Sequence, residues 1–312
     1  MVRKKVGILL GDITSYVTGS NPFRDDAEAA DRWLHPVDCG WMLDDRERSF
    51  GPFDPLGLPM QQLQGIGTVY VPSRTAAYGF AHWNELRSGR EDRERHAAAF
   101  MATANWFAAF PDGRILHEFP LLNLASPWLS ALAQGEALSI FARAFLLTEN
   151  PDWREHAERA IQWLATPVDA GGVLGALPDG SPFLEEYPGT RHAGVLNGCL
   201  YALAGLADAR EMGVSDMGLV DRVADAVENN LRFWNRGGWS LYQWSDGSGS
   251  AANFNTPSYQ QVHISLLTHL ADTLGRPAFR SEANELRRGL ASPALRIRAL
   301  ASKLRYRFSY GW

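Results

Sequence analysis

Residues 183–198 read FLEEYPGTRHAGVLNG and place two carboxylates beside a phenol. Glu185 and Glu186 precede Tyr187, and an arginine and a histidine follow in the same stretch. Carboxylates and phenols are groups that accept and donate protons during catalysis. Adjacent residues of an extended segment point to opposite sides, so only one of the two glutamates needs to face a cavity with a given neighbour. A proton-transfer site and a solvated surface loop both fit this composition, and both interpretations stay open.

A second group of tyrosines lies later in the chain, with Tyr242 in GGWSLYQWSDG and Tyr259 in NTPSYQQVHISLL. Tyr259 stands at the start of a predicted helix, and His263 follows four residues later, so their side chains share one helical face. Spacing alone favours core packing for both. The position of Tyr259 where a long connection meets a helix favours a cavity.

Several polar side chains stand in or beside apolar helical patterns, at Arg74, His82, Gln134, Arg191 and Asn197. Buried polar groups need hydrogen-bond partners. These side chains can satisfy one another, and a cavity that binds a hydroxylated, anionic ligand would use the same residue types.

The elements that must position these residues are predicted to be helices in pairs. The pairs are 73–89 with 91–110, 127–148 with 151–166, 194–213 with 220–235, and 259–275 with 277–290. The first helix of each pair is apolar nearly all round and belongs inside, whereas the second is amphipathic and belongs outside. Repetition of such a pair is typical of concentric helical layers. The sequence therefore predicts a mainly α fold, an (α/α) toroid or incomplete barrel, over residues 71–290.

Long connections of β-like sequence join an outer helix to the next inner one, at 111–123, 169–188 and 236–258. Long connections on a rigid scaffold commonly carry function. Because all three occupy the same kind of junction, we expect them to cluster on one face. Residues 1–70, rich in Gly and Pro, are expected to be a short β-rich or irregular segment, and 291–312 a basic amphipathic tail.

Composition narrows the class of protein. Of 312 residues, 46% are hydrophobic and 21% charged, which predicts a sizeable core and argues against disorder. The net charge of −5 argues against non-specific binding of nucleic acid. The apolar run VGILLG is shorter than a signal-peptide core, and no run approaches the roughly 20 apolar residues of a membrane span. A cytoplasmic protein is expected.

No metal or cofactor is expected from the motifs. The cysteines, Cys39 and Cys199, form no C-x-x-C pair, and two buried thiols are favoured over a disulfide. The acidic residues between 44 and 54 could hold calcium, but their spacing fits no calcium loop and a solvated loop is favoured. The GIG at 65–67 is followed by a strand, which excludes the dinucleotide fingerprint there.

Six blocks of the chain resemble the C-terminal helical domain of the D-glucuronyl C5-epimerases, which convert D-glucuronate to L-iduronate in heparan-type polymers. The family pattern has an S-A-M-A-Q-G-Q-A helix, then W-Y-E-E-Y-P, then V-L-N-G. Residues 130–137, 183–188 and 195–198 correspond to these in the same order. VYVPSRTAAYGFAHW at 69–83, WSLYQWSDG and YQQVHI resemble further family motifs, so the resemblance covers about 69–275.

The resemblance implies an α/α toroid with a β-rich N-terminal part, a homodimer, and a uronic-acid polysaccharide or oligosaccharide as substrate. It also implies that Glu186, Tyr187, Tyr242 and Tyr259 are catalytic. Ser245 replaces an arginine that follows the Y-D-L motif of the animal enzymes, so Arg191 or Arg74 is expected to bind the substrate carboxylate. The N-terminal part is short, which leaves open a different uronate glycan. The expected substrate-binding residues are Arg74, Tyr78, His82, Gln134, Arg191, Asn197, Trp239 and His263.

These residues would support inversion at C5 of a uronate by proton transfer on two faces, without a redox cofactor. Glu186 is a plausible base on one face and Tyr259 an acid on the other, since an unperturbed tyrosine, with a pKa of about 10, keeps its proton at neutral pH. Which group abstracts and which donates is left open. The alternatives are a uronate polysaccharide lyase, which expels the C4 oxygen from the same intermediate, and a glycan-binding module without activity.

The tail LRIRALASKLRYRFSYGW mixes basic residues with large apolar ones. Packing of a terminal helix on the domain or on a partner is the favoured interpretation. Peripheral contact with a membrane that carries lipid-linked glycan is the alternative.

Overall fold

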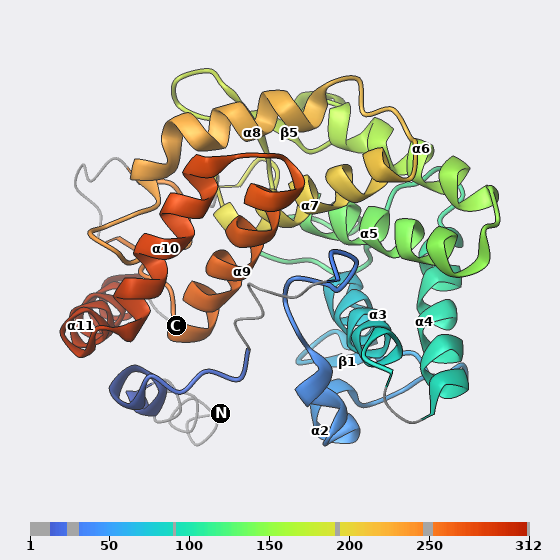
Figure 1. Cartoon of the computed structure of the whole chain (residues 1–312), viewed down its shortest axis with the longest axis horizontal. Helices are drawn as coiled ribbons and strands as arrows, with labels where there is room; N and C mark the ends of the chain where they lie inside the picture. Colours follow the sequence, from blue (N-terminus) through green and yellow to red (C-terminus); the bar gives the residue numbers. More distant parts are fainter. Residues whose placement is uncertain (1–12, 24–30, 90–91, 191–193, 246–251, 311–312) are drawn as a thin grey trace. The chain divides into compact units, whose positions relative to one another are not determined.

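The chain is mainly helical, as its sequence predicts. The computed structural model describes residues 13–23, 31–89, 92–190, 194–245 and 252–310 (Figure 1). About 58% of the described residues are helical and their strands form only small pairs, which confirms the mainly α class. The chain divides into two compact units, Glu28–Ala226 and Met1–Ala27 with Val227–Trp312. A toroid would run through both units, so the toroid and the predicted domain boundaries stay predictions.

The first unit contains three predicted inner helices and their outer partners. They are α3 (Pro72–Arg87) with α4 (Arg93–Ala108), α5 (Ala131–Thr148) with α6 (Asp152–Ala165), and α7 (Leu196–Glu211) with α8 (Leu219–Asn230), whose end belongs to the second unit. Along α5 and α7 most side chains are buried, whereas α6 buries one stripe that includes Trp153, Ala157 and Leu164. The inner and outer patterns read from the sequence are therefore confirmed for these helices.

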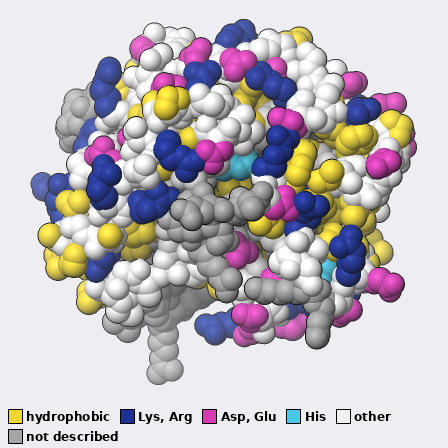
Figure 2. Space-filling model, in the orientation of Figure 1, with side chains coloured by type: hydrophobic (Ala, Val, Ile, Leu, Met, Phe, Trp, Pro, Cys, Tyr) yellow, Lys and Arg dark blue, Asp and Glu magenta, His cyan; other side chains and the backbone are white. Residues whose placement is uncertain are grey.

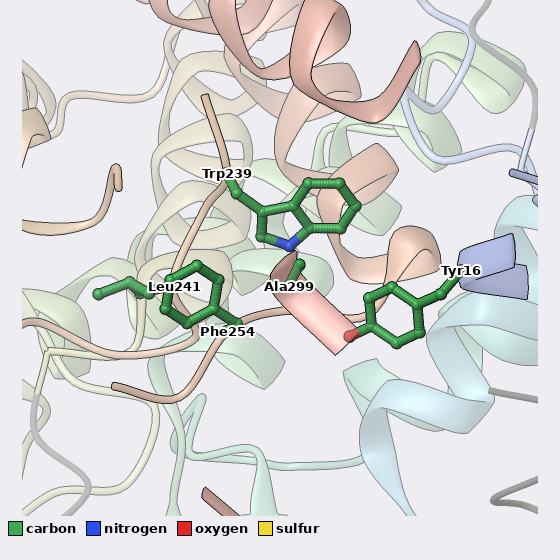
Figure 3. Packing of buried hydrophobic residues seen from close by; sticks show 5 residues of the cluster. All are labelled: Tyr16, Trp239, Leu241, Phe254 and Ala299. Atoms are coloured by element: carbon green, nitrogen blue, oxygen red, sulfur yellow. The ribbon is translucent and has the colours of Figure 1, made fainter. Parts of the chain in front are cut away.

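The second unit holds the fourth pair, α9 (Pro257–Thr273) and α10 (Pro277–Ala291), preceded by η3 (Leu231–Phe233) and followed by α11 (Pro293–Tyr310). A buried cluster joins helical residues 13–18, the connection before α9, and α11; its members are Tyr16, Trp239, Leu241, Phe254 and Ala299 (Figure 3). The Tyr16 hydroxyl and the Trp239 indole N–H both donate to the carbonyl of Asn255, at 2.8 and 3.0 Å. The predicted basic tail is thus a helix with one face packed in its own unit.

Short elements occupy the segments that the sequence marks as irregular. Before α3 lie η1 (Gly40–Leu43), α2 (Arg46–Phe50) and the hairpin of β1 (Gln61–Leu63) and β2 (Gly67–Val69). The first two long connections contain β3 (Leu116–His117) paired with β4 (Trp128–Leu129), then η2 (Val168–Ala170), and β5 (Leu174–Ala176) paired with β6 (Pro182–Leu184). The third connection has isolated bridges between Asn235 and Ser240 and between Leu241 and Phe254.

Two glutamines show that the helix pairs repeat in detail. Gln134 and Gln260 each stand in the first turn of an inner helix, α5 or α9. The Gln134 amide donates to the carbonyls of Gly113 and Ala160, and its oxygen accepts from the Ile115 N–H. Gln260 makes the matching bonds to Gly238, Leu286 and Ser240. Each amide thereby ties the inner helix to the connection before it and to the outer helix after it.

The three hydrogen bonds between the Gln260 side chain and backbone groups, called here the Gln260 clamp, should contribute strongly to stability. Its amide donates to the carbonyls of Gly238 and Leu286 at 3.1 and 3.0 Å, and its oxygen accepts from the Ser240 N–H at 2.8 Å. Gln260→Leu would leave these buried backbone groups unpaired, so we expect a loss of about 3 kcal/mol or more in the free energy of unfolding, measured by urea denaturation. Gln162→Leu on the exposed face of α6 is the matched control and should change it by less than about 0.5 kcal/mol. Equal losses in the two variants would contradict the clamp.

The surface carries charges of both signs. On the face seen in Figure 2, Lys and Arg side chains lie among Asp and Glu side chains, as is typical of a solvated surface. Among the described residues no helix combines the length and the apolar character needed to cross a bilayer. Cys39 and Cys199 are both buried and unbridged, as the sequence favours.

Candidate active site

Glu186 is buried and contacts residues in the first turn of α7. It follows β6 by two residues, and its Oε2 accepts a hydrogen bond of 3.1 Å from the Asn197 side chain in the first turn of α7. The side chain is 6% exposed. A Cβ at Gly198 would lie 2.6 Å from the Glu186 Cβ, so only glycine fits there without displacement. Asn197 therefore donates a hydrogen bond to this carboxylate, and Gly198 leaves space for its side chain.

The electrostatics suit Glu186 to exchange protons near neutral pH. Burial raises its pKa from 4.5 to about 7, while hydrogen bonds from the side chains of Tyr187 and Asn197 and from the Gly198 backbone act in the opposite direction. A general base works best when its pKa lies close to the working pH. Glu186 can therefore take up and release a proton under ordinary conditions.

Glu185 points into a different environment, as expected for adjacent residues of an extended segment. Its Oε2 accepts from the Gly194 N–H at 3.0 Å, and its backbone carbonyl accepts from the Ala131 N–H at the start of α5. Its Cγ lies against Gly175 in β5. These contacts give Glu185 the role of joining the connection to two helix starts.

The buried Glu185 carboxyl predicts a stability difference that depends on pH. Burial raises its pKa from 4.5 to about 7, so the folded protein binds this proton more tightly than the unfolded chain does. That contribution to stability is complete below about pH 4.5 and is lost as the pH rises through about 7. Glu185→Gln should therefore gain stability relative to the wild type between pH 5 and pH 8, by up to roughly 3 kcal/mol. Urea denaturation at both pH values tests this, with the exposed Glu118→Gln as control; a difference that does not grow with pH would contradict it.

Tyr187 lies beside an aromatic group from the first long connection. Its ring centroid is 6.0 Å from that of Trp128, and His117 stacks on Trp128 at 3.9 Å. Both ring nitrogens of His117 are buried without a hydrogen-bond partner. Burial lowers the pKa of His117 to about 3, so its imidazole is neutral at pH 7. His117 is therefore a candidate ligand-binding residue that the sequence did not predict. The one sequence signal for it is its place in a long connection between an outer and an inner helix.

Glu136 is a second buried carboxyl near Glu186. It lies on α5, is 5% exposed, and its Oε2 is buried without a hydrogen-bond partner. Burial, and then the charge of Glu186, raise its pKa well above the usual value. Its signal in the sequence is a glutamate that interrupts the otherwise apolar pattern of α5.

Arg74, Tyr78 and His82 lie four residues apart on α3, so the structure brings these three predicted binding residues onto one helical face. The Arg74 guanidinium donates to the Gly51 carbonyl, and its Nε is buried without a partner. The Tyr78 hydroxyl accepts from the side chain of Arg46 at 3.3 Å. Arg46, on α2, therefore adds a further cation next to this face of α3.

His82 pairs with a second histidine. Its Nδ1 lies 2.8 Å from Nδ1 of His96, and its Nε2 is buried without a partner. Burial lowers the pKa of His82 to about 3, with a smaller contribution from His96, so the ring is neutral at pH 7. It can bind a ligand by hydrogen bonding but not as a cation.

The remaining predicted binding residues of the first unit differ in their contacts. Asn197 contacts Glu186, which places it in the site. Gln134 uses its amide on backbone groups, so the structure gives it a structural function and its role in substrate binding stays a prediction. Arg191 lies outside the described residues.

The second unit brings Tyr242 and Tyr259 together. Their ring centroids are 5.9 Å apart in an edge-to-face arrangement, and Tyr259 is 44% exposed. His263, one turn further along α9, is fully buried; its Nδ1 lies 3.4 Å from the Asn255 side chain and its Nε2 has no partner. Trp239 is fully buried in the core of this unit, which leaves it a core residue in this structure.

Glu186 and Tyr187 thus belong to one unit, and Tyr242 and Tyr259 to the other. That the two sets face one substrate stays a prediction.

Within the described residues, no group of three or more His, Cys, Asp or Glu side chains is placed to hold a metal ion. The acidic residues considered for calcium make local bonds. Asp45 caps α2 by accepting from the Arg48 N–H. Asp54 accepts from the backbone of Leu58 and, at 2.5 Å, from the Tyr70 hydroxyl.

Comparison with known proteins gives consistent matches. The sequence model of the family described as D-glucuronyl C5-epimerase C-terminus matches residues 107–288. The D-glucuronyl C5-epimerase of Caenorhabditis elegans is 30% identical over 202 residues, which are 57% of this chain and 33% of the nematode protein. An uncharacterized protein of Methanocaldococcus jannaschii is 28% identical over 151 residues, 47% of each chain. The chain therefore spans only a third to a half of the length of these relatives.

Proposed function

The chain belongs to the D-glucuronyl C5-epimerase C-terminal family, and from this membership we propose that it inverts C5 of a uronic acid residue in a glycan. The observation that carries the proposal is the state of Glu186. This carboxyl is buried, its pKa is raised to about 7, and Tyr187 and Asn197 hold it in place. All four residues proposed to be catalytic fall within the matched region 107–288.

The proposed reaction begins with removal of the C5 hydrogen as a proton by Glu186. The electron pair left at C5 spreads into the substrate carboxylate, whose growing charge needs cations or hydrogen-bond donors in a site that excludes water. The phenols of Tyr187 and Tyr242 would donate to this carboxylate or to the glycosidic oxygens. The phenol of Tyr259 would return a proton to the opposite face of C5, and the product would then leave inverted.

Arginines on and near α3 support an anionic substrate. Arg74 shares one face of α3 with Tyr78 and His82, and Arg46 on α2 contacts the Tyr78 hydroxyl. A guanidinium binds a carboxylate through two parallel hydrogen bonds, which suits a uronate. We propose that these side chains, with Asn197, bind the sugar of a uronic-acid polysaccharide or oligosaccharide. A homodimer and a cytoplasmic location remain part of this proposal, and contact of the tail with a membrane remains the alternative to its packing on the domain or a partner.

A deuterium experiment tests the proposed function. The protein is incubated in deuterated water with a glucuronate-containing polymer, and the C5 position is examined by nuclear magnetic resonance. We expect deuterium at C5 and L-iduronate among the products. Ultraviolet absorbance of an unsaturated uronate would instead indicate a lyase, and binding of the polymer without exchange would indicate a binding module.

A further inference from the structure

Glu136 is a buried acid to which the proposed reaction assigns no function. It lies on α5 among apolar and small residues, and its Oε2 is one of the buried side-chain atoms that have no hydrogen-bond partner. An unpaired charge in such a place is costly, so a buried carboxyl without a donor favours its neutral form. Glu136 therefore has a different electrostatic state from a solvated glutamate.

Close packing of α5 on α7 brings the backbone next to Glu136 against the helix whose start contacts Glu186, and the charge of Glu186 acts on Glu136. A Cβ at Gly135 would lie 2.4 Å from the Ala202 Cα, and one at Gly205 would lie 2.1 Å from the Gly135 carbonyl, so the two helix backbones touch. Gly198, one turn before Ala202 on the same helix, lies against Glu186. Glu136, which follows Gly135, and Glu186, which contacts Gly198, thus both lie along the α5–α7 interface, which we call the helical seam.

Of the two carboxyls in this seam, Glu186 receives hydrogen bonds, whereas the Oε2 of Glu136 receives none. Glu186 accepts from the Asn197 side chain at 3.1 Å, and Tyr187 and the Gly198 backbone also donate to it. The Oε2 of Glu136 receives no hydrogen bond. Two neighbouring carboxyls cannot both ionise cheaply, and donors stabilise the charged one. The negative charge of the pair therefore belongs on Glu186, and the proton on Glu136.

We propose that Glu136 is a positioning residue of the site, which holds a proton at neutral pH and acts as a neutral hydrogen-bond donor beside Glu186. This inference rests on the proposed function. Before the reaction the pair holds one proton, on Glu136. When Glu186 takes the C5 hydrogen as a proton, the pair holds two, and no covalent bond to Glu136 is made or broken beyond its own O–H. Glu186 then releases its proton to solvent after turnover.

The neutral state matters because the substrate is itself an anion. An ionised Glu136 would add a second negative charge to a site that must accept a uronate and build more charge on it, which the electrostatic argument disfavours. The titratable groups on the elements around α5 include Glu185 and Glu186 before α7, and the Arg143–Asp208 ion pair between α5 and α7. They also include the His82–His96 pair on α3 and α4, His156 on α6, and Cys39 before η1. Arg143 already pairs with Asp208 at 2.6 Å.

Infrared spectroscopy tests whether Glu136 holds a proton without any substrate. At pH 8 the wild type should show the carbonyl band of a protonated carboxylic acid, and Glu136→Gln should lack it. Glu282→Gln is the matched control, because Glu282 is a half-buried glutamate whose pKa is raised by burial to about 7 and which is ionised at pH 8. Loss of the band in the control, or no difference between the wild type and Glu136→Gln, would overturn the assignment of the proton.

Kinetics test whether that proton serves turnover. Glu136→Leu removes the donor and should lower kcat by about 10- to 100-fold with a small change in KM. It should fold at least as well as the wild type, since it removes an unpaired buried polar atom. Glu136→Gln, a neutral donor of the same shape, should restore most of the lost kcat and leave the acid limb of the pH profile in place. A shift of that limb by a unit or more toward acid in Glu136→Gln would show that Glu136 is ionised in the wild type and would overturn the inference.

The two failures can be told apart. If the wild type exchanges C5 hydrogen but the infrared band or the rescue is absent, the role of Glu136 alone is overturned. If the wild type exchanges with no uronate glycan, the proposed function and the role of Glu136 in turnover are both overturned, and the infrared band still decides the location of the proton.

Discussion

Glu186→Gln is expected to lower the rate of C5 hydrogen exchange by about 10²- to 10⁴-fold, the range for loss of a general base. The amide keeps the size of the carboxyl and can still bind Asn197, but it cannot accept a proton from carbon. Substrate affinity should change little, because the variant removes a group that acts mainly in the transition state. The measurement is deuterium incorporation at C5, together with polymer binding by calorimetry.

Glu185→Gln is the matched control for this variant. It also removes a buried carboxyl with a pKa near 7, one position away, but Glu185 contacts the Gly194 backbone and not Asn197. Its exchange rate should stay within about threefold of the wild type, a free-energy difference below about 0.7 kcal/mol. Equal losses of exchange rate in the two variants would mean that the reaction depends on negative charge at either glutamate and not on a base at Glu186.

Tyr259→Phe should abolish inversion and retain binding. The change removes one oxygen from a side chain that is 44% exposed, so the fold should tolerate it. Without the phenol, the face of C5 opposite Glu186 has no proton donor, and we expect a loss in the rate of inversion of about 10²- to 10⁴-fold. Tyr306→Phe on α11 serves as control. Unchanged inversion in Tyr259→Phe would remove this residue from the mechanism.

The sequence predicted the helices well because their patterns are local. An apolar helix followed by an amphipathic one is legible over about 30 residues, and the structure confirms the inner and outer types for α5, α6 and α7. The roles of single polar residues were harder to predict. Gln134 and Glu136 both interrupt the apolar pattern of α5, yet one binds three backbone groups and the other has an unpaired oxygen.

The reason is that the role of each residue depends on its partners, which come from distant parts of the chain. Gly113 and Ala160 satisfy Gln134, whereas the neighbour of Glu136 is another acid, Glu186. Trp239 illustrates the same limit, since a tryptophan in a functional type of connection suits a sugar ring or a core equally. The structure shows it fully buried beside Tyr16.

The measurement that tests the central claim most directly follows the origin of the hydrogen that arrives at C5. Polymer with ordinary hydrogen at C5 is converted in deuterated water, and L-iduronate formed during the first few per cent of reaction is analysed. If a carboxylate removes the proton and a separate phenol, equilibrated with solvent, supplies its replacement, nearly every new L-iduronate carries deuterium at C5. Product that keeps its original hydrogen would mean that one group both takes and returns it, and would contradict an acid and a base on opposite faces of the sugar.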